Sequence, residues 1–188
     1  EKKRNLIYIF MESTEVTFAD QASGGAFPQN TIPELTKIAE DNEDFSDAAP
    51  TLNGGYAMPG ATWTMGAMFA QTSGLPLKIS IDQNAMDSQK SFFPDILTIG
   101  DILEKQGYTQ ELMLGSVGYF GGRKLYFQTH GNYAIKDFSY WKNQHKFPAD
   151  YWVNWGFEDR KLYEYAQEEL TRLGSSEQPF NLTMLTVD

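Results

Sequence analysis

Two oxygen-bearing side chains stand at positions where an enzyme with alternating strands and helices would use them. Glu12 directly follows an apolar run, residues 5–11, so its carboxylate should lie at the edge of a sheet, where it could bind a metal ion. Thr62 follows a loop rich in glycine and precedes an apolar helical stretch, residues 63–72. A hydroxyl at a helix start is a candidate nucleophile, because the free N–H groups and the helix dipole there favour a phosphate and an alkoxide.

Each of these residues also has a plainer interpretation. Glu12 would serve equally well as a helix cap or a solvated loop residue, and Glu15 and Asp20 are competing carboxylates nearby. Thr62 would serve as an N-cap without any catalytic role. Thr64 is the alternative nucleophile, but its hydroxyl should point away from the site if Thr62 begins the helix.

The elements that must position these side chains alternate along the chain. Strands are expected at residues 5–11, 111–114, 133–138 and 180–187, and helices at 33–42, 63–72, 94–106, 124–129 and 157–173. This alternation predicts an α/β three-layer sandwich with a mostly parallel central sheet, whose ligand site lies beyond the carboxyl ends of the strands. The continuous apolar character of the first strand predicts a central strand covered on both faces.

Inside this framework the helix predicted over residues 94–106 is the most clearly amphipathic. Its inward face is expected to carry the apolar residues Ile96, Leu97, Ile99, Ile102 and Leu103. No repeat, low-complexity tract or linker divides the chain. Residues 1–188 are therefore expected to belong to a single domain.

Composition excludes several classes of function. With 41% hydrophobic and 21% charged residues over 188 positions, the chain resembles an ordinary globular protein. Its net charge of −10 argues against nucleic acid as a partner and against an anionic membrane surface. Cysteine is absent, which excludes disulfides, thiolate metal ligands and a cysteine nucleophile. No apolar stretch approaches the roughly 20 residues that a membrane-spanning helix needs.

Several motifs, taken in order, resemble one family. Residues 5–13 (NLIYIFMES) resemble the opening strand and metal-binding Glu of lipoteichoic acid synthases and of the related phosphoglycerol transferases that modify periplasmic glucans. Residues 60–62 (GAT) fall where that family has its Gly-x-Thr nucleophile, and residues 62–77 are similar to the glucan-modifying branch. Residues 121–131 match the stretch in which the family places an Arg, here Arg123, on the substrate phosphate.

The resemblance covers nearly the whole chain and implies both a fold and a metal. The fold would be sulfatase-like, within the alkaline phosphatase superfamily, and residues 1–188 would form the N-terminal part of a single catalytic domain truncated at its C-terminal end. A divalent cation, Mn²⁺ with Zn²⁺ or Mg²⁺ as alternatives, would be bound by Glu12 and Thr62. Coordination would convert the Thr62 hydroxyl into a nucleophile at neutral pH.

The resemblance also implies a reaction and a location. Thr62 would take phosphoglycerol from a phosphatidylglycerol-type lipid donor, hold it as a phospho-threonine ester and pass it to a glycan or polyglycerolphosphate acceptor. Arg123 would clamp a phosphate oxygen with its planar guanidinium. The domain would lie at the extracellular or periplasmic face of the bacterial cell membrane, anchored by upstream helices outside this chain.

The chain departs from the family pattern in two places. The Asp-His pair and the His-containing stretch that complete the family's metal site are not found, and the sequences around His130 and His145 favour surface or loop roles. We therefore expect this fragment itself to be inactive. Gly121 stands where the family has a Trp; Tyr119 or Phe120 could supply an aromatic wall instead, or could equally serve in packing, and the sequence leaves both interpretations open.

Three other functions are compatible with this type of fold and differ in the residues that they require. A sulfatase would need a Cys or Ser in a Cys/Ser-x-Pro/Ala-x-Arg setting; the chain has no Cys, and none of its serines has that setting. A phosphatase or phosphodiesterase would share the first half of the reaction and use water as acceptor, so sequence leaves it open. A non-catalytic binding module with the same fold is the alternative from another class.

Overall fold

The computed structural model describes residues 2–187, and the chain divides into two compact units. The larger, here called the sheet unit, comprises residues 2–12 and 59–187, and the smaller comprises residues 13–58. Within the described residues, the structure contains no helix with the length and apolarity needed to cross a membrane.

A four-stranded sheet forms the centre of the sheet unit. Its strands are β1 (Leu6–Phe10), β2 (Thr109–Leu114), β3 (Ala134–Lys136) and β4 (Phe180–Leu185), in the order β1-β4-β2-β3. All neighbouring strands run parallel, which confirms the predicted sheet type. The register places Phe10, Leu114 and Leu185 level with one another, so the carboxyl ends of three strands meet at one edge.

The position of β1 differs from the prediction. Among the described strands, β1 lies at an edge of the sheet and β4 and β2 are central. Tyr8 and Phe10 face the core, whereas Ile7 and Ile9 on the opposite face are exposed. The apolar run alone could not separate these cases, because Ile and Tyr favour any strand, whether one or both of its faces are covered.

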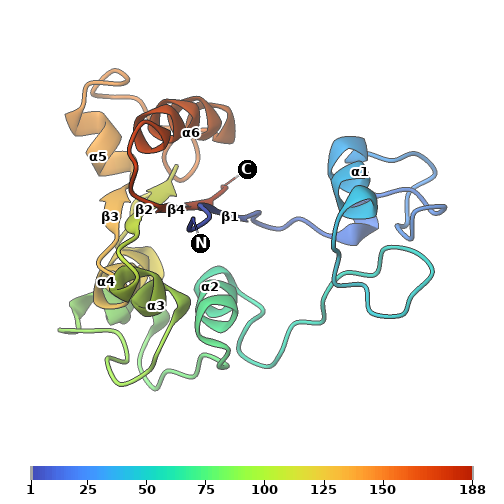
Figure 1. Cartoon of the computed structure of the whole chain (residues 1–188), viewed down its shortest axis with the longest axis horizontal. Helices are drawn as coiled ribbons and strands as arrows, with labels where there is room; N and C mark the ends of the chain where they lie inside the picture. The colour runs from blue at the N-terminus through green and yellow to red at the C-terminus, as the bar shows by residue number, and fades with distance from the viewer. Residues whose placement is uncertain (1, 188) are drawn as a thin grey trace. The chain divides into compact units, whose positions relative to one another are not determined.

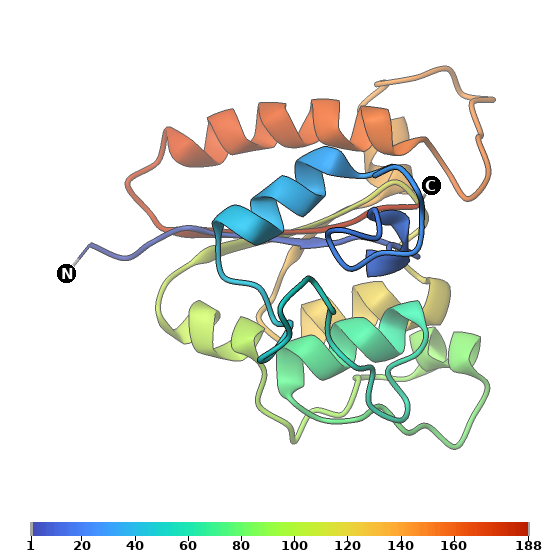
Figure 2. The same cartoon turned by 90° about the vertical axis from the view of Figure 1, so that its right-hand side faces the viewer.

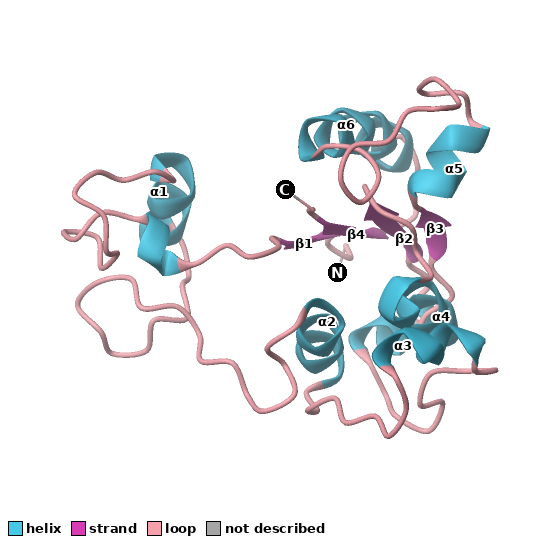
Figure 3. Cartoon of the chain, turned by 180° about the vertical axis from the view of Figure 1, so that it is seen from behind, coloured by secondary structure: helices cyan, strands magenta, loops and turns pink. Residues whose placement is uncertain are grey.

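Helices cover both faces of the sheet (Figures 1 to 3). Helices α2 (Thr64–Ser73), α3 (Ile99–Lys105) and α4 (Arg123–Thr129) lie on one side, and α5 (Phe138–Asn143) and α6 (Asp159–Gly174) lie on the other. Each side has its own hydrophobic core against the sheet. This is the three-layer α/β arrangement that the alternation of elements predicted.

The helix predicted over residues 94–106 begins later than expected, at Ile99. Thr98 and Asp101 form a capping box there: the Asp101 backbone N–H donates to Thr98 Oγ1 (3.3 Å), and the Thr98 N–H donates to Asp101 Oδ2 (2.8 Å). Leu97, before this cap, is 58% exposed, and Ile102 is also exposed, so both depart from the predicted inward face. Apolar residues before position 98 led to the prediction of an earlier start, but the cap at Thr98 determines where the helix begins.

The other helices mostly follow the prediction. Helix α2 ends at Gly74, whose left-handed conformation (φ 74°) forms the expected C-cap. Helix α5 was not predicted, and neither were the short 3₁₀ helices η2 (Gln83–Ser88) and η3 (Phe120–Gly122).

The smaller unit consists largely of loops around one helix. Helix α1 (Pro33–Asp41) has a proline in its first turn, as predicted. A 3₁₀ helix, η1 (Val16–Phe18), precedes it. The Thr31 backbone N–H and hydroxyl both donate to the carbonyl oxygen of Phe18, at 3.0 and 2.7 Å, which closes the loop between η1 and α1.

Candidate functional site

Glu12 stands two residues beyond the end of β1 and is fixed there by the neighbouring strand. Its backbone N–H donates to Thr186 Oγ1 (2.8 Å), and the Thr186 N–H donates to the carbonyl oxygen of Phe10 (3.0 Å). The Glu12 side chain is half-buried. The predicted strand-end carboxylate therefore does lie at the carboxyl edge of the sheet.

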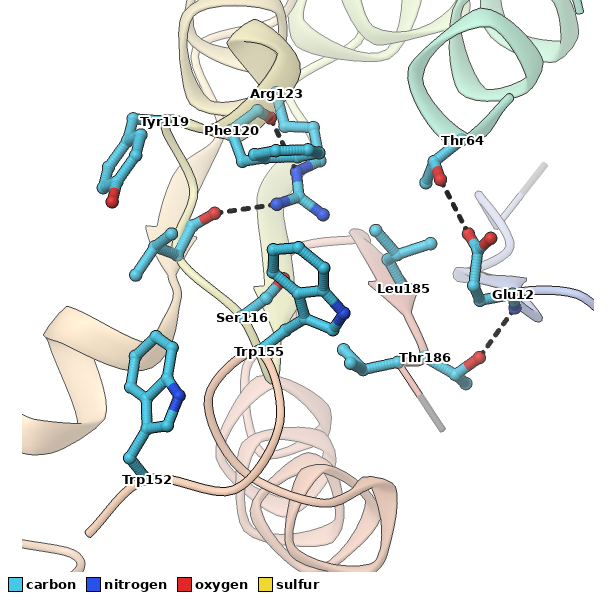
Figure 4. A pocket seen from close by; sticks show the side chains of 12 residues that line it. Glu12, Thr64, Ser116, Tyr119, Phe120, Arg123, Trp152, Trp155, Leu185 and Thr186 are labelled. Carbon is cyan, nitrogen blue, oxygen red and sulfur yellow. Dashed lines mark hydrogen bonds between the residues drawn. The ribbon is translucent and has the colours of Figure 1, made fainter. Parts of the chain in front are cut away.

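A threonine hydroxyl meets this carboxylate. Thr64 Oγ1 donates a hydrogen bond of 2.8 Å to Glu12 Oε2, and Figure 4 shows the two side chains pointing toward one another. Thr64 is the first residue of α2, and Trp63 occupies the N-cap position with an extended backbone. The arrangement places a hydroxyl, a carboxylate and the start of a helix at one point.

This geometry corrects the expected position of the hydroxyl. Thr62 does not begin the helix; it is exposed and does not line the cavity that Glu12 and Thr64 share. The loop folds back tightly over the first turn of α2, since a Cβ at Gly66 would stand only 2.1 Å from the carbonyl oxygen of Gly60. Residues 60–63 form that turn, so the helix starts at Thr64, one residue later than predicted, and Thr64 rather than Thr62 stands at its first position.

Arg123 extends into the same cavity from α4 (Figure 4). Its Nε donates to the carbonyl oxygen of Phe120 (3.0 Å) and its Nη2 to that of Val117 (2.8 Å), and the side chain is only 6% exposed. Burial lowers the pKa of the Arg123 guanidinium to about 10, against the opposing effect of the carboxylates of Glu12 and Asp137. Among the described residues this guanidinium has no ion pair, so it is a desolvated cation that would favour an anionic ligand.

Two glycines determine how Arg123 enters the site. Gly121 and Gly122 both have positive φ, 65° and 74°, in the turn that leads into α4. A Cβ at Gly122 would also meet Met86 and Phe92 at 2.9 Å. The backbone here therefore strongly favours glycine, which gives a physical reason for Gly121 where a Trp was expected from the resemblance.

The cavity measures about 360 Å³ and has an aromatic side. Tyr119 and Phe120 line it, so of the two interpretations the structure favours an aromatic wall. Trp152 and Trp155, in the loop between α5 and α6, also line it and were not predicted. No local pattern marks these two tryptophans, because they reach the site only through the long connection after α5.

Two hydroxyl-bearing residues of the cavity were also missed. Ser116 stands two residues beyond β2 and Thr186 directly after β4, at the same sheet edge as Glu12. Within residues 2–187, the buried Ser116 Oγ has no hydrogen-bond partner. The available signal was position, since a polar residue directly after each buried strand of a parallel sheet faces the same edge.

The donor set fits a hard cation only in part. Glu12 and Thr64 bring two oxygen atoms together, which suits Mn²⁺ or Mg²⁺ better than a soft metal. Among residues 2–187, no cluster of three or more His, Cys, Asp or Glu side chains could hold a metal ion. His145 is exposed, as predicted. His130 lies in the turn after α4, which fits the predicted loop role, but it is buried, so the surface alternative was wrong for it. Its Nε2 donates to the carbonyl oxygen of Phe92 (2.7 Å), and its Nδ1 lies 3.1 Å from Asp101 Oδ2.

The chain resembles known proteins in sequence and in fold, although no family model matches it. Phosphoglycerol transferase I of Xanthomonas axonopodis pv. citri is 31% identical over 188 residues, 100% of this chain and 25% of that protein. Phosphoglycerol transferase I of Escherichia fergusonii is 34% identical over 186 residues, 99% of this chain and 23% of that protein. The chain thus spans about a quarter of the length of these curated relatives. A crystal structure of a protein in the alkaline phosphatase superfamily from Vibrio parahaemolyticus matches with a TM-score of 0.74 at 24% identity, over 100% of this chain and 41% of that one.

Proposed function

We propose that this chain, which is homologous along its whole length to the phosphoglycerol transferase I proteins and has an alkaline phosphatase superfamily fold, carries the nucleophile of a phosphoglycerol transferase. Homology and fold support a phosphoryl-transfer type of function. The observation that carries the finer proposal is the hydrogen bond from Thr64 to Glu12 in a cavity shared with the buried Arg123. A hydroxyl, its carboxylate partner and a desolvated cation are the groups that transfer of a phosphate ester requires.

In the first half of the reaction, Thr64 Oγ attacks the phosphorus of a phosphatidylglycerol-type donor. A bond forms from phosphorus to Thr64 Oγ, and the bond from phosphorus to the diacylglycerol oxygen breaks. The proton lost by the Thr64 hydroxyl ends on that oxygen, so diacylglycerol leaves as an alcohol. Glu12 Oε2, which accepts the hydrogen bond from Thr64, orients the hydroxyl for this attack.

In the second half, an acceptor hydroxyl attacks the phospho-threonine ester. Its oxygen bonds to phosphorus, the bond to Thr64 Oγ breaks, and the acceptor proton restores the Thr64 hydroxyl. Arg123 contributes in both halves, because its position in the cavity lets the guanidinium bind nonbridging phosphate oxygens while two carbonyls hold its other N–H groups.

A divalent cation fits this proposal as a further part of the site. Glu12 and Thr64 are the described residues that would hold it, together with ligands from elsewhere in a longer protein. When bound, such a cation lowers the pKa of a coordinated hydroxyl and offsets phosphate charge. We further propose that the domain acts at the outer face of a bacterial membrane, where a lipid donor is available.

The test compares two threonines that lie two residues apart. In the complete protein, Thr64→Ala should reduce release of diacylglycerol from phosphatidylglycerol by at least about 10³-fold, because no nucleophile remains. Thr62→Ala is the matched control and should stay within about twofold, because Thr62 is exposed outside the cavity.

Mass spectrometry of the quenched reaction provides the second measurement. It should find a phosphoglycerol adduct on the peptide that contains Thr64, and fragmentation should place it on that side chain. An adduct on Thr62, or full turnover by the Thr64→Ala variant, would overturn the assignment.

A further inference from the structure

The two helices that begin at the cavity are joined by a buried hydrogen bond. Helix α2 begins with Thr64 and helix α4 begins with Arg123, and both side chains extend into the cavity (Figure 4). Further along the same helices, Thr72 Oγ1 lies 2.6 Å from the Tyr126 hydroxyl oxygen, and both residues are buried. Among the described residues this is the only hydrogen bond between α2 and α4. The phosphate chemistry described above does not use it.

The direction of this hydrogen bond follows from the protons that are available. Thr72 Oγ1 donates its single proton to the carbonyl oxygen of Met68, one turn earlier, at 2.7 Å. The Tyr126 hydroxyl is therefore the donor to Thr72 Oγ1. Burial raises the pKa of Tyr126, so the hydroxyl keeps its proton at neutral pH.

Aromatic packing holds the Tyr126 ring in one orientation. Its centroid lies 5.4 Å from that of Phe69 on α2 and 5.1 Å from those of Phe92 and Phe127. Tyr126 is only 1% exposed, so its ring could turn toward another acceptor only if the surrounding core repacked. The phenol oxygen is therefore held toward α2.

Near the cavity, the contact between the two helices is apolar. Gly121, in the turn before α4, packs beside Trp63 and Met65 at the start of α2: a Cβ at Gly121 would stand 3.5 Å from Met65 Cβ. Hydrophobic contact is non-directional, so it holds the helices together without fixing their register. The hydrogen bond from Tyr126 to Thr72 has a defined length and direction and can fix it.

The helices transmit this constraint to the site. Thr72 stands eight residues after Thr64, about 12 Å along the helix axis at 1.5 Å per residue, and Tyr126 stands three residues after Arg123. A hydrogen-bonded helix moves largely as a unit. A shift of α4 against α2 at the buried hydrogen bond therefore also shifts the guanidinium against the hydroxyl in the cavity.

We propose that Tyr126 and Thr72 are positioning residues that set the distance between the Thr64 hydroxyl and the Arg123 guanidinium. This inference rests on the proposed function, in which Thr64 attacks a phosphorus whose nonbridging oxygens Arg123 binds. Such groups must be held to within about 0.5 Å of the productive geometry. Loss of the hydrogen bond should therefore slow the chemical step and change substrate binding little.

The kinetics of diacylglycerol release from phosphatidylglycerol by the complete protein test this role. Tyr126→Phe and Thr72→Val should each lower kcat about tenfold and change KM less than about twofold. Thr72→Ser keeps the hydroxyl and should retain kcat within about twofold, even though loss of a buried methyl group makes the protein less stable. Wild-type kcat in both Tyr126→Phe and Thr72→Val would overturn the proposal.

The matched control is Tyr133→Phe. Tyr133 is 3% exposed, lies in the same hydrophobic core as Tyr126, and accepts a hydrogen bond of 2.7 Å from Asn181 Nδ2. Its hydroxyl contacts neither α2 nor α4 through a hydrogen bond among the described residues. Loss of this equally buried phenol hydroxyl should leave kcat within about twofold of the wild type.

A double variant separates positioning from stability. Thr72→Val leaves the Tyr126 hydroxyl buried without an acceptor, so the urea midpoint should fall, and adding Tyr126→Phe removes that hydroxyl and should restore much of the midpoint. The kcat of the double variant should stay at the level of the single variants, because both substitutions remove the same interaction. Recovery of kcat together with the midpoint would show that the pair serves stability alone and would overturn its positioning role.

Crystal structures of the complete protein provide a measurement that needs no turnover. With the sheets superposed, the distance from Thr64 Oγ1 to Arg123 Cζ should differ by about 0.5 Å or more between the wild type and Tyr126→Phe. An unchanged distance would overturn the positioning role. A wild type that fails to cleave phosphatidylglycerol, while the distance changes in the variant, would count against the proposed function alone.

Discussion

Arg123 is held in the cavity by two hydrogen bonds that its planar guanidinium donates to backbone carbonyls. Its Nε and Nη2 bind the carbonyl oxygens of Phe120 and Val117, which leaves the remaining N–H groups for an anion. An ammonium keeps the charge but cannot bind both carbonyls and a phosphate in this fork geometry. Glycerol phosphate, which resembles the transferred group, should inhibit release of diacylglycerol from phosphatidylglycerol by the complete protein. In the Arg123→Lys variant, this inhibition should be about tenfold or more weaker.

The same site has a predicted pH dependence. Because burial lowers the pKa of Arg123 to about 10, the guanidinium is charged at neutral pH and loses its proton as pH rises through about 10. Glycerol phosphate affinity should therefore fall above about pH 9. Arg160→Lys, at an exposed position on α6, is the matched control, and equal inhibition of the Arg123→Lys variant would show that Arg123 does not bind the anion.

The sequence predicted the position of the carboxylate correctly and placed the candidate nucleophile two residues too early, at Thr62 instead of Thr64. Glu12 was predicted correctly at the strand end, because a carboxylate after a buried strand has few other places to lie. The choice between Thr62 and Thr64 depends on where α2 begins. That start is determined by the close approach of Gly66 to Gly60, which no periodicity in the sequence reveals.

The packing of α6 on the sheet includes a buried ion network. Lys136 Nζ lies 2.6 Å from Glu169 Oε2 and 3.3 Å from Glu111 Oε2, and Arg172 pairs with both carboxylates from the helix end. Burial raises the pKa of Glu169, but hydrogen bonds from Lys136 and Arg172 outweigh it, so the net pKa is lowered. The network therefore stabilises the fold while Glu169 is ionised.

The lowered pKa of Glu169 makes the packing of α6 on the sheet sensitive to acid. A carboxyl group with a lowered folded-state pKa contributes stability above its unfolded pKa, and this is lost as pH falls through the folded value. The urea midpoint of the wild type should therefore drop below about pH 4.5. Glu169→Gln should be less stable at pH 7 and show a smaller drop, whereas the exposed Glu164→Gln should behave as the wild type. Equal acid sensitivity in Glu169→Gln and the wild type would contradict this role.

Element types were predictable where one apolar face dominates. Helices α2 and α6 and strands β2 and β4 follow from their apolar patterns. Helix α5 was missed because its six residues, Phe138–Asn143, are too few to show a period, and it begins only because Asp137 accepts a hydrogen bond from the Tyr140 N–H (3.0 Å). The early start predicted for α3 was wrong because a capping box outweighs apolar residues upstream of it.

Across the whole molecule, the parallel register of the strands brings together site residues that belong to separate sequence motifs. It brings Glu12, Ser116 and Thr186 to one edge from positions that are 70 or more residues apart in sequence (186 − 116 = 70). The sequence predicted this edge but not the strand order, since the pairing of strands far apart in the chain leaves little local trace: the most apolar strand, β1 (LIYIF), lies at an edge, whereas β2 (TQELML), with three polar residues, is central. The aromatic wall depends on the same long-range packing, which explains why Trp152 and Trp155 were not predicted.

The donor set of the whole chain leads to a prediction about metal binding. Glu12 and Thr64 provide two oxygen ligands, and residues 2–187 contain no cluster of three or more His, Cys, Asp or Glu side chains that could hold a metal ion. A cation such as Mn²⁺ prefers about six ligands and stays largely hydrated on two. Calorimetric titration of the 188-residue chain should therefore give a Kd weaker than about 10⁻⁴ M, and Glu12→Gln should abolish the remaining heat, whereas Glu15→Gln should not. Tight stoichiometric binding by this chain, or binding that survives Glu12→Gln, would show that the cation has other ligands and that Glu12 serves only to orient Thr64.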